Sequence, residues 1–149
     1  MEYKDKTEFR VLIVEPQKSP YAAEIDLDLD ILQTLVGGSI QFVPLDRHSS
    51  LYRNAEGKLQ GLPGNRRLDN GDIVTGTFVI FYDDGTRDNA SLTDEQVERY
   101  MRRFKEPEQF SYQQVKDIGL LLSGLFAARM NLSRHFLMKK QRMTWNDNR

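Results

Sequence analysis

Residues 72–82 read Asp-Ile-Val-Thr-Gly-Thr-Phe-Val-Ile-Phe-Tyr. β-Branched and aromatic residues fill this stretch, and beyond Gly76 both alternating sets of positions are largely apolar. A strand that is apolar on both sides is typical of the middle of a sheet, because both of its faces are covered. We therefore expect one long central strand over residues 72–82.

Weaker strand patterns precede it. Residues 8–14 and 21–25 are rich in β-branched and aromatic side chains, and the five residues between them suit an antiparallel hairpin. Residues 39–43 predict another strand, and residues 51–54 with 58–62 predict a second hairpin around Glu56-Gly57. The expected fold class is α+β: a mixed, mainly antiparallel sheet of about five strands with helices on one face.

Helix signals are local and specific. Asp26, Asp28 and Asp30 precede an apolar run that ends at Gly37-Gly38, which predicts a short helix with a glycine cap. A capping box of Thr93 with Gln96 predicts a second helix, ended by Pro107. Ser111 with Gln114 predicts a third, whose apolar positions recur as far as Phe136. Thirty helical residues would extend about 45 Å, so this helix either covers the sheet or projects from it.

Charge divides the chain near Pro107. Residues 1–100 hold 11 Lys and Arg against 18 Asp and Glu, whereas residues 101–149 hold 10 against 4. We therefore expect an α+β domain over residues 1–106 and a basic helical segment over residues 107–149. The absence of cysteine excludes disulfides, thiolate catalysis and cysteine-bound zinc, and it fits a cytoplasmic protein. No stretch is apolar and long enough for a signal peptide or a membrane span, so no membrane partner is expected.

One loop has the composition of an anion site. Glycines let backbone N–H groups converge on a ligand, and arginines add charge-assisted hydrogen bonds to phosphate. The candidate residues are Gly61, Gly64, Asn65, Arg66 and Arg67. A structural turn capped by the asparagine side chain explains the same residues, and the sequence leaves the two readings open.

The basic segment is the candidate for partner binding, through Arg129, Arg134, Lys139, Lys140, Arg142 and Trp145. Arginine and lysine could follow phosphates while the tryptophan stacks on a base. The overall isoelectric point of about 6.1 argues against a dedicated nucleic-acid module. A partner protein, self-association through this helix and nucleic acid therefore stay open as its targets.

Catalytic and metal patterns are weak. Asp46, His48, Ser49 and Ser50 supply hydrolase residue types, but adjacency in sequence does not make a triad, and a polar loop explains them. Asp26, Asp28 and Asp30 fail the calcium-loop pattern, because its glycine and glutamate positions hold Ile31 and Gly37. We expect no enzyme activity, no metal and no cofactor.

Several short motifs occur in a fixed order: residues 11–16, 54–59, 61–63, 65–66, 71–78 and 91–96. In this order they resemble an uncharacterised small α+β domain family, a domain of unknown function, over about residues 9–104. Such domains are found in phages, plasmids and conjugative elements of Gram-positive bacteria. The resemblance implies no catalytic residue, and it does not cover the segment after Pro107.

These observations predict a non-enzymatic binding protein of a phage or mobile element that occupies the surface of a host protein. The resemblance makes a defence effector a candidate target, with CRISPR inhibition the leading activity. Two alternatives are sequestration of a small anionic ligand, such as a signalling nucleotide, and nucleic-acid binding by the last helix.

Overall fold

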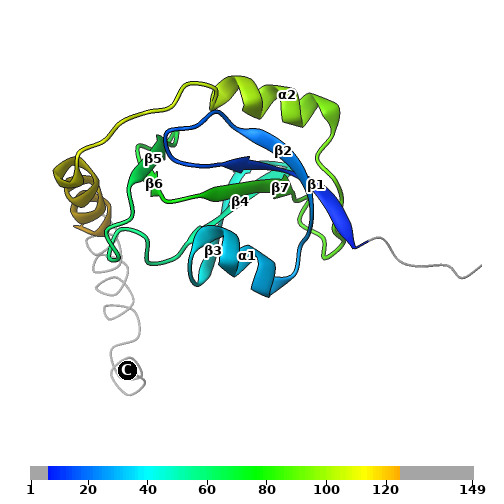
Figure 1. Cartoon of the computed structure of the whole chain (residues 1–149), viewed down its shortest axis with the longest axis horizontal. Helices are drawn as coiled ribbons and strands as arrows, with labels where there is room; N and C mark the ends of the chain where they lie inside the picture. The colour runs from blue at the N-terminus through cyan, green and yellow to red at the C-terminus, as the bar shows by residue number, and fades with distance from the viewer. Residues whose placement is uncertain (1–6, 125–149) are drawn as a thin grey trace, which may run out of the picture.

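The strand β7 (Phe78–Tyr82) lies at the centre of a five-stranded sheet in the computed structural model, which describes residues 7–124 (Figure 1). The strand order is β2-β1-β7-β4-β3, and each neighbouring pair is antiparallel. The other strands are β1 (Glu8–Val14), β2 (Tyr21–Asp26), β3 (Ile40–Asp46) and β4 (Ser49–Asn54). The predicted α+β class and the central position of residues 78–82 are confirmed.

The predicted single strand over residues 72–82 is wrong, because the chain turns at Gly76. Gly76 has φ +72°, and a Cβ there would lie 2.8 Å from Leu62 Cδ1. Residues before the turn form β6 (Ile73–Thr75), which leaves the large sheet and pairs with β5 (Gly64–Arg67) in a two-stranded sheet. Residues 64–67 are therefore a strand, where the sequence predicted a loop.

The predicted hairpin of residues 51–54 with 58–62 is also wrong. β4 instead pairs with β3 on one side and β7 on the other. The Asn54 side chain redirects the chain: its Oδ1 accepts the Glu56 N–H at 2.8 Å, and its Nδ2 donates to Val36 O at 3.2 Å. Residues 55–61 consequently form consecutive turns.

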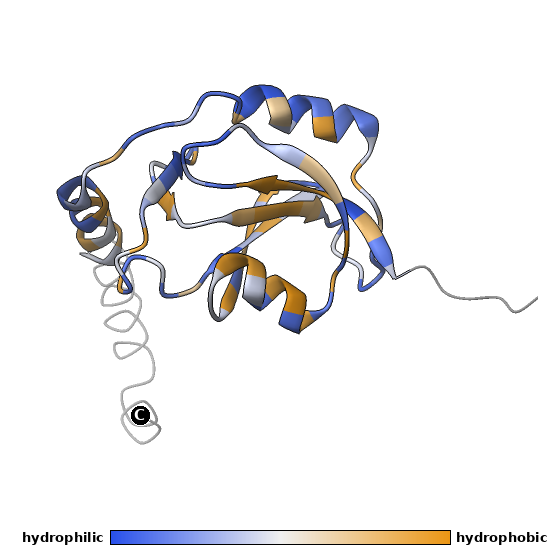
Figure 2. Cartoon of the chain, in the orientation of Figure 1, coloured by the Kyte–Doolittle hydropathy of each residue, from blue (hydrophilic) through white to orange (hydrophobic). Residues whose placement is uncertain are grey.

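Two helices cover opposite faces of the large sheet, whereas one face was predicted (Figure 1). Leu12, Leu51 and Ile80 pack with Tyr100 and Phe104 at α2 (Asp94–Arg103). The alternate residues of the same strands, Val11, Ile13, Val79 and Phe81, pack with Leu35 of α1 (Leu29–Val36). Figure 2 shows apolar colouring on these central strands and on α1. Burying each large apolar side chain contributes about 1.5–3 kcal/mol, which makes this double core the main source of stability.

The predicted helix starts are confirmed. Asp28 accepts the Asp30 N–H at the start of α1, and Gly37 follows its end at φ 84°. The capping box of Thr93 with Gln96 begins α2. A matching box begins the helical residues 112–124: Ser111 N–H donates to Gln114 Oε1 at 2.7 Å, and Gln114 N–H donates to Ser111 Oγ at 3.1 Å.

α2 ends at Arg103, four residues before the predicted Pro107. Phe104 closes the helix, and its carbonyl oxygen accepts hydrogen bonds from the buried Arg66 side chain. None of the helices within residues 7–124 is long and apolar enough to span a bilayer.

Candidate functional site

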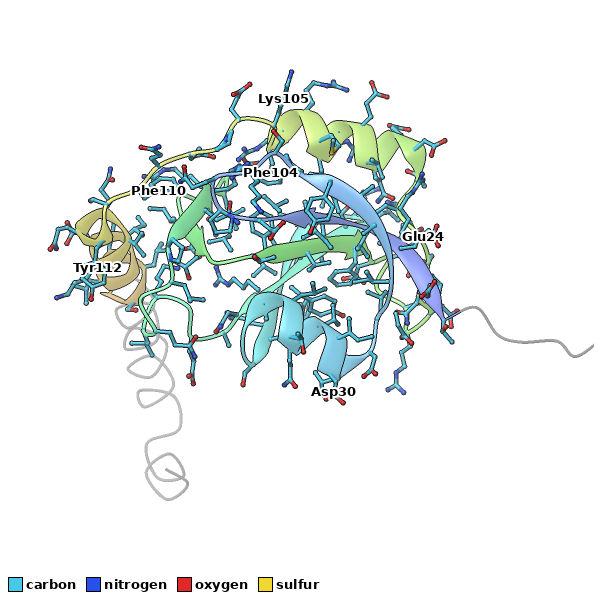
Figure 3. The ribbon with its side chains drawn as sticks, viewed as in Figure 1. Glu24, Asp30, Phe104, Lys105, Phe110 and Tyr112 are labelled. Carbon is cyan, nitrogen blue, oxygen red and sulfur yellow. The ribbon has the colours of Figure 1, made fainter. Side chains whose placement is uncertain are left out.

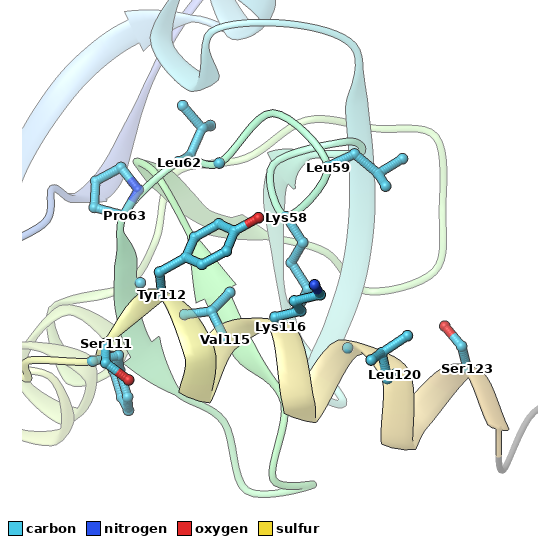
Figure 4. A pocket seen from close by; sticks show the side chains of 14 residues that line it. Lys58, Leu59, Leu62, Pro63, Ser111, Tyr112, Val115, Lys116, Leu120 and Ser123 are labelled. Carbon is cyan, nitrogen blue, oxygen red and sulfur yellow. The ribbon is translucent and has the colours of Figure 1, made fainter.

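A groove of about 520 Å³ lies between the turn at residues 58–64 and the helical residues 112–124 (Figure 4). Leu59, Leu62 and Pro63 line the turn side, while Tyr112, Val115 and Leu120 line the helix side. Figure 3 places Phe110 and Tyr112 at this end of the molecule, far from Asp30 on α1. An apolar cavity of this size is typical of a site that binds a ligand or a partner side chain.

Gly64 allows the helix to lie against the small sheet. A Cβ at Gly64 would lie 2.9 Å from Phe110 Cδ2 and 3.0 Å from Val115 Cγ2, closer than side chains pack. Val115 is only 5% exposed, and it anchors the helix on β5. The sequence left open whether the third helix packs or projects; in the described residues it packs on β5 at Val115, while Leu120 and Leu121 stay exposed.

The rest of that helix leaves apolar surface in water. Tyr112 is 68% exposed and Leu120 is 63% exposed, and Leu59 on the opposite wall is 89% exposed. Single exposed apolar residues are common on proteins, but several around one concavity mark a binding surface.

The charged residues at the groove are cations. Lys58 and Lys116 line it, and its described lining includes no Asp or Glu. The Lys58 stem crosses Gly119, where a Cβ would lie 3.1 Å from Lys58 Cδ, and its Nζ lies 2.9 Å from Asp72 Oδ1. Lys116 makes no ion pair with another described residue, so its charge faces solvent.

Asp72 holds the base of the turn. Its Oδ2 accepts from Arg53 Nη1 at 2.6 Å, while Oδ1 has Lys58 Nζ as an ion-pair neighbour without a well-aligned hydrogen bond. Burial alone raises the pKa of the Asp72 carboxyl. The hydrogen bond from Arg53 and the positive charges of Arg53 and Lys58 outweigh burial, so this pKa lies below its ordinary value.

The structure divides the five predicted anion-site residues. Gly61 and Gly64 line the groove. Asn65 is fully buried, and its Nδ2 donates to Val14 O and Gly76 O at 2.9 Å each. Arg67 is exposed, donates to Gly71 O at 2.9 Å, and lies 5.5 Å from the centre of the Phe110 ring.

Arg66 is fully buried and ties three segments together. Its guanidinium donates to Phe104 O, Lys18 O and Asn65 Oδ1. Burial lowers the pKa of Arg66, and the negative end of the α2 dipole stabilises its charge. Arg66 thus faces main-chain carbonyls inside the protein, away from the groove.

A polar cleft of about 500 Å³ lies between α2 and the turn that joins β3 to β4. Asp46 accepts the Tyr100 hydroxyl and the His48 backbone N–H, and it pairs with Arg99 at 3.0 Å. Burial raises the Asp46 pKa, but these hydrogen bonds and the Arg99 charge outweigh it and lower the pKa overall. The hydrogen bond from Tyr100 to Asp46 and the ion pair of Asp46 with Arg99 therefore hold α2 against the end of β3.

The Ser49 and Ser50 hydroxyls, next to this cleft, are also used in hydrogen bonds within the fold. Ser49 Oγ accepts from Gln96 Nε2 at 2.9 Å, and Ser50 Oγ donates to Asp83 Oδ2 at 2.7 Å. Neither hydroxyl is bonded to His48. Within residues 7–124, no group of three His, Asp or Glu side chains is placed to hold a metal ion.

The predicted partner-binding residues Arg129, Arg134, Lys139, Lys140, Arg142 and Trp145 lie outside the described residues. Sequence reasoning missed residues 110–123 as a wall of a cavity. The available signal was the adjacent leucines Leu120 and Leu121, which exceed what a single buried stripe needs. The structure leaves both exposed, and Leu120 lines the groove.

The fold and groove define a small α+β domain with an appended helix that completes an apolar cavity. The chain belongs to the family described as a domain of unknown function, DUF3846, whose model matches residues 9–105. No curated protein and no solved structure matches the chain. One groove wall, residues 58–64, lies inside the matched domain, and the other, residues 110–123, follows it.

Proposed function

We propose that this protein is a non-enzymatic binding protein that uses the groove to occupy a surface of another protein. The observation that carries the proposal is the apolar concavity itself, whose walls expose Leu59, Tyr112 and Leu120 to water. Protein interfaces are built around such apolar and aromatic centres, which a partner side chain fills.

The charge pattern supports the same proposal. Lys116 and the basic residues that follow in sequence lie at one end of a chain whose first hundred residues carry excess acid. Complementary fields of this kind accelerate association and select among partners more than they raise affinity.

The partner class comes from the resemblance to domains of phages, plasmids and conjugative elements. On this basis the partner is a host protein in the bacterial cytoplasm, and the protein inhibits or regulates it. A defence effector is the leading target, which makes CRISPR inhibition the leading activity.

Anion binding is a second candidate function, because Gly61, Gly64, Lys58 and Lys116 all line the same groove. Two glycines and two cations beside apolar walls could sequester a small anion with an apolar or aromatic body, such as a signalling nucleotide. Titration calorimetry with a nucleotide panel tests it, and absence of heat with every member would eliminate this function.

The main proposal is tested by site-specific photo-crosslinking of the full chain in its bacterial host. A photoreactive residue at Leu120 reports the groove, and one at Leu29, which is 54% exposed on α1, is the matched control. We expect one stoichiometric protein adduct from position 120 and none from position 29. Equal labelling from both positions, or no protein adduct, contradicts the proposal, and native mass spectrometry of the purified complex gives the stoichiometry.

A further inference from the structure

We propose that the groove recognises an acidic amphipathic helix of the partner, with apolar side chains entering the groove and carboxylates facing Lys116. The inference rests on the proposed function and adds the chemistry and conformation of the segment that is bound.

The shape of the groove favours a helix over an extended peptide. The helix-side lining recurs at Ser111, Val115, Gly119 and Ser123, a row spaced by four residues that spans about 18 Å at 1.5 Å per residue. Val115 packs against Gly64 and the Lys58 stem covers Gly119, so the surface that remains open to a partner is formed by the neighbouring Tyr112, Lys116 and Leu120, which are also spaced by four residues.

The lack of free backbone hydrogen-bonding groups along the helical wall also favours a helical partner over an extended one. An extended peptide must pair its N–H and C=O groups with a free strand edge, or those groups lose hydrogen bonds when they are buried. Residues 112–124 are helical, so their interior amides and carbonyls are bonded to one another. A partner helix satisfies its own backbone and offers only side chains at i, i+3, i+4 and i+7 to the apolar walls.

Charge complementarity fixes the sign of the partner. The charged residues in the described lining are Lys58 and Lys116, and Asp72 already pairs with Lys58. The chain continues from Gly124, next to Ser123 of the groove, into residues 125–149, which hold six Lys and Arg and one Asp by sequence. At the groove lining itself a cationic segment would meet the like charge of Lys116, whereas an acidic segment could pair with it.

Three synthetic helical peptides test the inference against the full chain, with binding followed by fluorescence anisotropy. The first carries Leu at i, i+3, i+4 and i+7 with Glu elsewhere, the second replaces Glu by Lys, and the third keeps Glu but replaces Leu by Ser. We expect the first to bind at least about tenfold more tightly than either other peptide. Equal binding of the Lys peptide overturns the acidic preference, and equal binding of the Ser peptide shows that charge alone, as for any polyanion, attracts the ligand.

Matched variants locate the binding site. Leu120→Ser should weaken the Glu–Leu peptide about tenfold, because Leu120 lines the groove, whereas Leu121→Ser should change its affinity by less than about twofold. Both leucines are exposed, at 63% and 57%, so neither change unfolds the protein. Lys116→Glu should weaken binding several-fold, and Lys105→Glu, beyond the end of α2 (Figure 3), should not. Equal effects within either pair contradict the proposed position.

The peptide and crosslinking results separate the two proposals. A protein adduct at position 120 without binding of the Glu–Leu peptide leaves the proposed function in place and overturns the acidic helix. Failure of both experiments overturns both.

Discussion

The guanidinium of Arg66 donates two hydrogen bonds to the carbonyl oxygen of Phe104, from Nε at 3.1 Å and from Nη2 at 2.9 Å. Phe104 closes α2, so this contact joins the end of that helix to β5, and Nη2 also reaches Lys18 O at 2.7 Å in the turn between β1 and β2. One buried side chain thus stabilises the junction that precedes the helical residues 112–124, which we call the groove helix.

Replacing Arg66 by Ala should destabilise the protein by about 2–5 kcal/mol, because it leaves several buried carbonyl oxygens without donors. Urea denaturation measures the change. Arg67→Ala is the neighbouring control and should lose less than about 1 kcal/mol, since its side chain is exposed and donates to Gly71 O. Equal losses in the two variants would show that the buried hydrogen bonds contribute little.

Gly76→Ala and Gly71→Ala separate backbone strain from steric overlap. Both glycines have positive φ, at +72° and +91°, which costs an alanine roughly 1–2 kcal/mol. A Cβ at Gly71 has no atom of residues 7–124 within 4 Å, whereas one at Gly76 would lie 2.8 Å from Leu62 Cδ1. Thermal or urea unfolding should therefore show a larger loss for Gly76→Ala. A loss no greater than that of Gly71→Ala would mean that Leu62 moves aside freely.

The elements that the sequence predicted correctly depend on neighbours in the chain. The caps at Asp28, Thr93 and Ser111 each use a partner two or three residues away, so short patterns identified them. The central strand was identified in a similar way, because the continuous apolar run at residues 78–82 is itself a local pattern.

The errors came from contacts between distant segments. Arg66 was predicted to bind an anion because the sequence does not show its real hydrogen-bond acceptors. These are Phe104 O and Lys18 O, which are 38 and 48 positions away in the chain. The turn at Gly76 depends on the close approach of Leu62, and the groove depends on the contact of Gly64 with Val115. Local pattern could not show that these segments meet.

Asp72 predicts how stability depends on pH. Its carboxyl pKa is lowered in the folded protein, so its contribution is present above the unfolded pKa of about 3.9 and is lost as pH falls through the lower folded pKa. Asp72→Asn should lose about 2–4 kcal/mol at pH 7 and much less at pH 2, since the native carboxyl is then increasingly protonated. Urea denaturation at both pH values measures this difference.

The control is Asp69→Asn, whose side chain is 97% exposed and pairs with Arg103 at the surface, and it should change stability little at either pH. A loss for Asp72→Asn that is the same at both pH values would contradict the ionic origin of its contribution.

Gly64→Ala should detach the groove helix while leaving the large sheet folded. The added Cβ would overlap Phe110 and Val115, at 2.9 and 3.0 Å, and these residues lie beyond the matched domain at the start of the groove helix. Hydrogen exchange should therefore accelerate about tenfold or more in residues 112–124, with little change in β1 and β7, because the local contacts are lost without the sheet core. Gly124→Ala is the control: it is on the same helix, no described residue lies within 4 Å of its Cβ, and it should slow exchange slightly through higher helix propensity. Unchanged exchange in Gly64→Ala would mean that the helix is held by something other than its contact with β5, and faster exchange in β7 would mean that helix and sheet unfold as one unit.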